Sequence, residues 1–158
     1  MKRMLSLLLT LLLVCLAMTA CAESTEPAEP GEVTETLLER VNRVAEDNLN
    51  LAVMSADDLY DLIGVPPEDY EDFAYLADYD ALSGRELIIV RAVDEEAAER
   101  VVEMLSHYLE LRMRETRNYL PDAYKALSVA EVLREDLLAV LSIAAPNPEE
   151  ASMLLQEE

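Results

Sequence analysis

His107 is the only histidine in the chain and the first candidate for chemistry. Glu103 and Glu110 flank it at the spacing that places side chains on one side of a helix. A histidine beside a carboxylate can serve as a base or ligate a metal, yet a zinc site needs further histidine or cysteine ligands. Ser106 adjoins His107, but adjacent residues of a helix do not face each other, so the two do not form a nucleophile and its base. We expect a partly exposed surface histidine, with no metal and no cofactor.

Carboxylates are so abundant, 33 Asp plus Glu in 158 residues, that finding pairs of them indicates little. Asp78 and Asp80 have the spacing of a calcium loop, but Leu82 and Ser83 occupy the positions of an oxygen ligand and the turn glycine. We interpret this stretch as a solvated turn. A carboxylate-dependent hydrolase would need two acids facing each other in a cleft at the separation of glycosidase acids. Acids confined to a convex surface would exclude such an enzyme.

Motifs of the common enzyme classes are absent from the sequence. Three glycines in the whole chain leave little room for the loops that cradle phosphates or dinucleotides, and no such loop is present. No G-x-S-x-G sequence is present either. The leading prediction is therefore a protein that is not an enzyme and that binds something or has a structural role.

The stretch "RMRETRNYLP" is the only basic cluster in this acidic chain. Its candidate binding residues are Arg112, Arg114, Arg117 and Tyr119. Compensation of the dipole at a helix end is the interpretation we favour, and a docking point for an anionic wall polymer is the alternative. The chain also has 7 tyrosines, a residue type that serves carbohydrate and peptide grooves. A pocket lined by two or more of them would favour a ligand-binding module, and a solid core would argue against one.

The charge of the chain restricts its partners. A net charge of −21 repels the phosphates of nucleic acids and the headgroups of anionic lipids, so we expect no nucleic acid partner. The hydrophobic fraction of 52% is well above that of disordered chains, so the chain is expected to fold.

The N-terminus has the layout of a secretory signal peptide, which we assign to residues 1–20. Lys2 and Arg3 precede a largely apolar run that is shorter than the roughly 20 residues of a membrane-spanning helix. Met18-Thr19-Ala20 before Cys21 resembles the bacterial lipobox, which makes Cys21 the predicted site of lipid attachment. Ordinary signal peptidase cleavage after Ala22 is the alternative, and it would give a secreted protein.

A lipid on Cys21 would anchor the chain to the extracytoplasmic face of the cell membrane, because two acyl chains hold a protein there stably. Residues 21–32 are acidic and rich in proline, so they form the predicted flexible tether. Residues 33–158 form the predicted single domain. An envelope protein or a wall polymer is the class of partner that this location implies.

The residue pattern of the domain predicts an α+β fold with a small, mostly antiparallel sheet. Three strands are expected at residues 73–79, 86–93 and 137–144, with a long helix at 94–118. We also expect a helix over residues 34–48, which begins at a cap on Thr34, and a last short helix that begins at Asn147. Shorter helices are expected after Ser55 and within residues 122–135. Whether the third strand follows a right-handed crossover or adds to one edge of the sheet is left open.

The strand at residues 86–93 is apolar on both faces. Ile88, Val90 and Ala92 share one face, while Leu87 and Ile89 lie on the other. We expect the long helix to cover one face and the N-terminal helix to lie on or near the other, because an exposed apolar face is a liability in an exported protein. The alternative is that the second face binds a partner.

Four blocks of the sequence, taken in order, resemble a family of small exported bacterial proteins known as domain of unknown function 4358. They are "DDLYDLIGVPPEDYEDF", "ELIIVRAVDEEAAERVVEML", "RMRETRNYLPDAY" and "LLAVLSIA", within residues 49–144. The "SGRE" and "REDLLAVLS" segments depart from the family pattern and affect the strand boundaries. The resemblance implies the fold and export, and it brings no catalytic residues.

Overall fold

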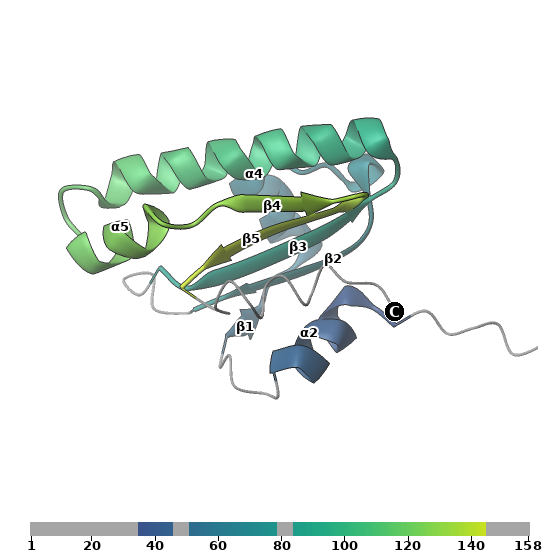
Figure 1. Ribbon diagram of the computed structural model, residues 1–158, viewed down its shortest axis with the longest axis horizontal. Coiled ribbons are helices and arrows are strands. Elements are labelled where there is room, and N and C mark those ends of the chain that lie inside the picture. The colour runs from purple at the N-terminus through teal and green to yellow at the C-terminus, as the bar shows by residue number, and fades with distance from the viewer. Residues whose placement is uncertain (1–34, 46–50, 79–83, 145–158) are drawn as a thin grey trace, which may run out of the picture. The chain divides into compact units, whose positions relative to one another are not determined.

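The computed structural model describes residues 35–45, 51–78 and 84–144. Within them, a five-stranded antiparallel sheet in the order β1-β2-β3-β5-β4 carries helices on both faces (Figure 1). The α+β prediction is therefore confirmed. The strands are β1 (Ala52–Val53), β2 (Tyr70–Ala77), β3 (Glu86–Ala92), β4 (Val132–Glu135) and β5 (Leu138–Ile143). The helical elements are α2 (Leu37–Ala45), α3 (Ala56–Asp58), the π-helix η1 (Leu59–Ile63), the 3-10 helix η2 (Pro67–Asp69), α4 (Glu95–Thr116) and α5 (Pro121–Leu127).

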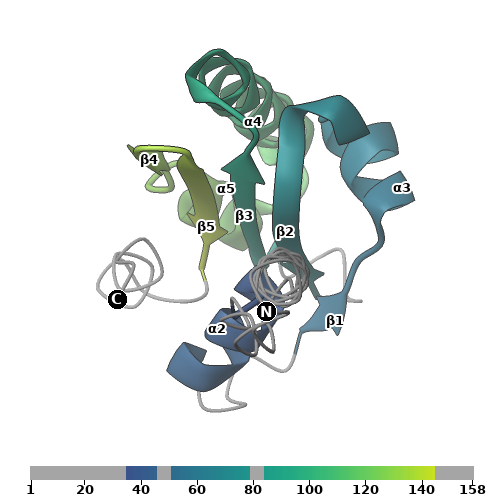
Figure 2. The same cartoon turned by 90° about the vertical axis from the view of Figure 1, so that its right-hand side faces the viewer.

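The alternation along β3 divides the core into two layers, as predicted. Ile88 and Val90 pack toward α4, where Val101 is among their partners. Leu87 and Ile89 face the other layer, in the cluster that holds Leu37 and Val41 of α2. Figure 2 shows the two helices on opposite sides of the sheet. Burying each of these side chains contributes about 1.5–3 kcal/mol, so both layers stabilise the sheet.

The prediction of three strands was wrong, because the sheet also has the edge strands β1 and β4. β1 pairs only Ala52 and Val53 with the end of β2, which is too short for any periodicity to appear in the sequence. β4 forms a hairpin with β5 through a turn in which Asp136 adopts a φ of 49°. Aspartate tolerates this left-handed conformation, so the hairpin forms without the glycine that signals such turns.

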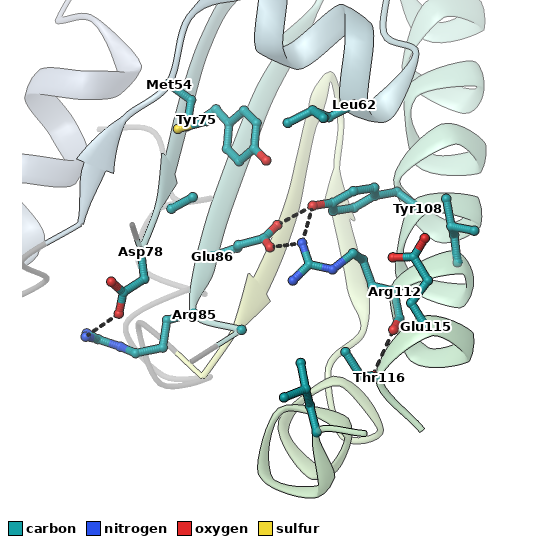
Figure 3. A pocket seen from close by; sticks show the side chains of 14 residues that line it. Met54, Leu62, Tyr75, Asp78, Arg85, Glu86, Tyr108, Arg112, Glu115 and Thr116 are labelled. Atoms are coloured by element: carbon teal, nitrogen blue, oxygen red, sulfur yellow. Dashed lines mark hydrogen bonds and ion pairs between the residues drawn. The ribbon is translucent and has the colours of Figure 1, made fainter. Parts of the chain in front are cut away.

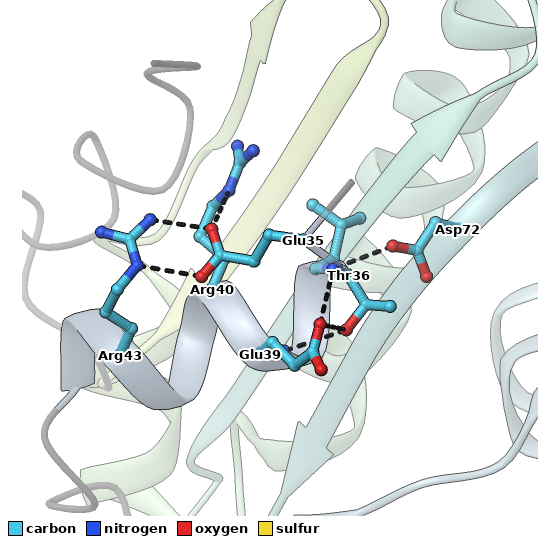
Figure 4. A network of polar contacts seen from close by, with 7 residues as sticks. Glu35, Thr36, Glu39, Arg40, Arg43 and Asp72 are labelled. Carbon is cyan, nitrogen blue, oxygen red and sulfur yellow. Dashed lines mark hydrogen bonds and ion pairs between the residues drawn. The ribbon is translucent and has the colours of Figure 1, made fainter. Parts of the chain in front are cut away.

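The long helix was predicted well, since α4 begins after Asp94, whose carboxylate accepts a 2.8 Å hydrogen bond from the Ala97 N–H. The cap of α2 was misplaced. It is Thr36, not Thr34, and Glu39 completes a capping box there, with its carboxylate 2.9 Å from the Thr36 nitrogen (Figure 4). The predicted signal peptide, Cys21, the tether and the last helix after Asn147 lie outside the described residues.

Contacts near both ends of β2 (Tyr70–Ala77) join neighbouring elements to the sheet. The Met54 N–H donates a 2.8 Å hydrogen bond to the Tyr75 carbonyl oxygen. The π-helix η1 ends at Gly64, whose φ of 92° favours glycine. Arg100 of α4 binds the buried Asp69 carboxylate, with Nη2 and Oδ1 2.6 Å apart. The first bond joins the segment before α3 to β2, and the ion pair joins α4 to η2.

None of the helices within residues 35–45, 51–78 and 84–144 combines the length and apolar composition needed to cross a membrane.

Candidate functional site

A cavity of about 470 Å³ lies between η1, α4 and the adjoining ends of β2 and β3 (Figure 3). Gly84 forms part of its wall and has a φ of 65°, and a Cβ there would lie 3.1 Å from the Ala123 Cβ of α5. A side chain would therefore be strained at this position. The residues that line the cavity are Met54, Leu62, Tyr75, Ala77, Asp78, Gly84, Arg85, Glu86, Tyr108, Leu111, Arg112, Glu115, Thr116 and Leu120.

One wall of the cavity is a polar network that joins β3 to α4. The Tyr108 hydroxyl donates a 2.6 Å hydrogen bond to Oε2 of Glu86. Nη1 of Arg112 donates to Oε1 of Glu86 and also to the Tyr108 hydroxyl oxygen, which is 2.8 Å away. The Arg112 guanidinium carbon lies 5.7 Å from the centre of the Tyr108 ring. Each of the three side chains therefore contacts the other two.

Glu86 is the residue that makes this network necessary. It begins β3 on the same face as Ile88 and Val90, which pack toward α4, and its exposed fraction is only 4%. A buried carboxylate is costly unless it is paired and hydrogen-bonded. Tyr108 and Arg112, one turn apart on α4, supply both the hydrogen bond and the opposite charge.

The network sets the ionisation of its members. Burial and the nearby Glu86 charge raise the pKa of Tyr75 to about 12. Burial, with the Glu86 charge second, also raises the pKa of Tyr108 far above that of a free tyrosine. Burial opposes the charge of Arg112, but Glu86 and Tyr108 outweigh it, so the pKa of Arg112 is raised. Around neutral pH these three residues thus contribute two neutral hydroxyl groups and the Arg112 guanidinium cation to the cavity wall.

Apolar side chains line other parts of the cavity. Met54 and Leu120 are half-buried, whereas Leu62 and Leu111 are 52% and 36% exposed. Figure 3 shows the Tyr75 hydroxyl directed into the space between Leu62 and the polar network. A ligand in the cavity would therefore meet apolar side chains as well as charged and hydrogen-bonding groups.

The carboxylates Asp78, Glu86 and Glu115 line this cavity. Glu86 uses both of its oxygens as acceptors, and Asp78 pairs with Arg85 at 3.9 Å. A glycosidase needs one acid to hold and release a proton beside a second acid. Glu86, tied to Arg112 and Tyr108, is not placed to be either of them.

A second, shallower hollow of about 380 Å³ lies along the end of α4 and α5. It is lined by His107, Glu110, Met113, Arg114, Arg117 and Tyr124. His107 is exposed, and the Ser106 hydroxyl donates to the Val102 carbonyl oxygen at 2.7 Å. Ser106 is thus bonded within its own helix.

A family model described as Domain of unknown function (DUF4358) matches residues 43–144. The chain belongs to this family. The resemblance drawn from the four sequence blocks is thereby confirmed. No match was found among curated proteins or among solved structures. The matched range includes every residue that lines the larger cavity, so this cavity lies within the DUF4358 domain.

The basic cluster predicted as a binding site is divided in the folded domain. Arg112 lines the larger cavity, whereas Arg114 and Arg117 line the second hollow. Tyr119 is 82% exposed and lines neither. The division follows from helix geometry, because residues two positions apart on a helix point in different directions.

Sequence reasoning missed Glu86, Tyr75 and Tyr108 as parts of one site. The available signal was the position of Glu86 at the head of an apolar strand, in phase with Ile88. An acid in phase with core residues predicts a buried cationic partner. Arg112, one turn after Tyr108 on the same helix, could then have been proposed as that partner.

Metal binding has no support in the part of the chain that the structure describes. No group of three or more His, Cys, Asp or Glu side chains there could hold an ion. Asp78 of the rejected calcium loop pairs with Arg85, and Asp80 lies outside the described residues. Cys21, the predicted lipid site, lies outside them as well.

Proposed function

We propose that this DUF4358 protein is a non-enzymatic ligand-binding module, anchored by a lipid on Cys21 at the extracytoplasmic face of the cell membrane. The observation that carries the binding role is the cavity of about 470 Å³ with a partly buried ion pair in its wall. Tyr75 and Tyr108 both line it, which meets the condition set from the sequence for a binding module. The anchor and the location rest on the N-terminal sequence pattern.

The energetics of the cavity favour binding over a purely structural role. The cavity opens to solvent beside Leu62 and Leu111, which are 52% and 36% exposed, so a ligand can enter it. An ion pair with a buried member, such as Glu86–Arg112, is commonly no more stable than a well-packed apolar pair of similar volume. A domain with only a structural role would gain by replacing this pair with apolar side chains, so the polar wall is better explained by a ligand.

The location supports the same role. A tether over residues 21–32 would hold the domain near the membrane surface, where envelope molecules are its available ligands. A small molecule of the envelope, such as a fragment released from a wall polymer or from an envelope protein, is the kind of ligand that we propose. Should cleavage follow Ala22 instead, the same module would be secreted.

The test is a screen of a diverse small-molecule library by ¹H–¹⁵N NMR, using the protein purified from the membrane of an expressing bacterium. Binders are expected to shift amide signals around the cavity, and Leu62→Trp, which enlarges an exposed rim residue, is expected to remove those shifts. Tyr60→Trp is the matched control, because Tyr60 is 54% exposed on the same η1 and does not line the cavity. An absence of binders, or binders that Leu62→Trp leaves unaffected, would refute the proposal.

A further inference from the structure

The guanidinium of Arg112 has N–H donors that its bonds to Glu86 and Tyr108 do not use. One nitrogen, Nη1, makes both of its hydrogen bonds, to Glu86 and to Tyr108. Among the described residues, Nε and Nη2 of Arg112 have no hydrogen-bond partner. The side chain lines the cavity and keeps an exposed fraction of 20%. These remaining donors are therefore accessible to a ligand.

The free donors form one edge of the guanidinium plane. Nε and Nη2 present two nearly parallel N–H bonds, and this spacing matches the two oxygens of a carboxylate. The bonds from Nη1 to Glu86 and Tyr108 hold the plane in position before any ligand arrives (Figure 3). A donor edge fixed in advance binds with less loss of side-chain freedom, which favours affinity.

We propose that the ligand is a small zwitterion, an amino acid or a short peptide, whose carboxylate binds the Nε–Nη2 edge of Arg112. Its apolar side chain lies against Met54, Leu62 and Leu111. Its ammonium group lies near Glu115. This inference rests on the proposed binding function and names the class of ligand.

Glu115 supports the placement of the ammonium group. It follows Arg112 by three residues on α4, so the two side chains lie on the same side of the helix and both line the cavity. Within the part of the chain that the structure describes, Glu115 has no hydrogen-bond or ion-pair partner. An exposed carboxylate of this kind is available to pair with a cation.

The surrounding charge favours a zwitterion over a phosphate. Asp78, Glu86 and Glu115 line the cavity against the cations of Arg85 and Arg112, and the whole chain carries a net charge of −21. A dianion would be repelled by this excess of negative charge. A zwitterion brings no net charge, and each of its charged groups has an opposite partner in the cavity.

The Tyr75 hydroxyl adds a neutral donor beside the carboxylate. Its ring is buried in the core while the residue lines the cavity, and Figure 3 shows the hydroxyl directed toward the space above Glu86. Tyrosine hydroxyl groups both donate and accept. Tyr75 can therefore donate to a carboxylate oxygen that Arg112 leaves available.

The experiment measures binding of leucine and glycyl-leucine to the purified membrane-derived protein, by ¹H–¹⁵N NMR titration and calorimetry. The free dipeptide is expected to bind at the cavity, and its C-terminal amide at least about tenfold more weakly, because a bidentate charged contact is lost. The N-acetyl dipeptide is expected to bind several-fold more weakly, and inorganic phosphate is expected not to compete. Equal binding of acid and amide, or competition by phosphate, would overturn the inference.

Two variants locate the contact. Arg112→Lys keeps a positive charge opposite Glu86 but lacks the bidentate Nε–Nη2 edge. Its affinity for the free dipeptide is therefore expected to fall at least about tenfold. The matched control Arg114→Lys, on the same helix and outside this cavity, is expected to bind normally. Glu115→Gln changes an exposed position and does not endanger folding. It is expected to lower the affinity for the free dipeptide and to leave the affinity for the N-acetyl dipeptide unchanged. Equal losses in the two lysine variants would contradict the assignment.

The outcome separates this inference from the proposed function. If library compounds bind in the cavity but neither leucine nor glycyl-leucine does, the proposal of a zwitterionic ligand is refuted and the proposed binding function is retained. If nothing binds in the cavity, both are wrong.

Discussion

The Tyr108 hydroxyl lies 2.6 Å from the Glu86 carboxylate and donates to it, which joins α4 to the first residue of β3. These two side chains are buried, with exposed fractions of 5% and 4%. The bond therefore matters for stability as well as for the shape of the cavity.

Tyr108→Phe removes the donor and leaves a buried Glu86 oxygen without it. We expect the free energy of unfolding to fall by about 1–3 kcal/mol, the usual cost of a buried acceptor that loses its partner. Urea denaturation measures the difference. Tyr119→Phe is the control, because Tyr119 is 82% exposed, and it should change stability by less than about 0.5 kcal/mol. Equal losses in the two variants would show that the hydrogen bond contributes nothing.

Arg112→Leu leaves the Glu86 charge buried without its cation. We expect a loss toward the lower end of about 3–5 kcal/mol in the free energy of unfolding, since the Arg112 side chain is still 20% exposed. The double variant Glu86→Leu/Arg112→Leu should recover most of this loss, because no unpaired charge remains. Denaturant unfolding of the single and the double variant measures this recovery. A double variant less stable than Arg112→Leu alone would contradict the expectation.

Alkaline pH is expected to destabilise the domain through Tyr75. In the unfolded chain this group ionises near 10.0, whereas the folded pKa is about 12. The unfolded state therefore loses its proton first, and stability should fall as the pH rises from about 10 toward 12. Tyr75→Phe should show a smaller decrease over that window in denaturant midpoints, and Tyr60→Phe, at an exposed position, should match the wild type. An identical pH dependence in all three proteins would refute the assignment.

The attachment of α2 to the sheet is expected to depend on Asp72. Its Oδ2 accepts a 2.7 Å hydrogen bond from the Leu37 N–H at the start of α2, and a break in the β2–β3 register between Tyr70 and Asp72 accompanies this contact (Figure 4). Asp72→Ala should cost about 0.5–2 kcal/mol, as the loss of a helix cap does. Hydrogen exchange should accelerate in α2 and not in α4, whereas Glu71→Ala, at the exposed neighbouring position, should leave both unchanged.

The lipid anchor is expected to depend on Cys21 alone. Cys21→Ser should abolish incorporation of labelled palmitate, and Cys15→Ser should retain it, because Cys15 lies within the predicted signal peptide. Globomycin should block processing of the wild-type chain. A product that is processed normally without acylation would indicate cleavage after Ala22 and a secreted protein.

Much of the fold followed from local patterns. The β-branched run at residues 86–93 and the spacing of apolar residues along α4 predicted both elements, and the alternation along β3 predicted cover on both faces. The edge strands were missed because their pairing is a tertiary event. β1 has two residues, and Val132 and Leu133 of β4 are only half-buried, so neither strand has a strong pattern of its own.

The candidate site was the least predictable part. The sequence grouped Arg112 with Arg114, Arg117 and Tyr119 because they are neighbours in the chain, whereas the folded helix turns them to different surroundings. Arg112 instead meets Glu86, which lies 26 positions away.

By itself, the sequence determined the α+β class and the two-sided core, because hydrophobic periodicity is a local property that each segment carries alone. The family followed from the four sequence blocks and the family model that matches residues 43–144. The sequence also predicts the export signal and Cys21 as the lipid site. Only the tertiary structure decided that Glu86, Tyr108 and Arg112 meet and that a cavity lies beside them. The reason is that a buried charge selects its partner by proximity in space, and that proximity exists only after β3 and α4 have packed together.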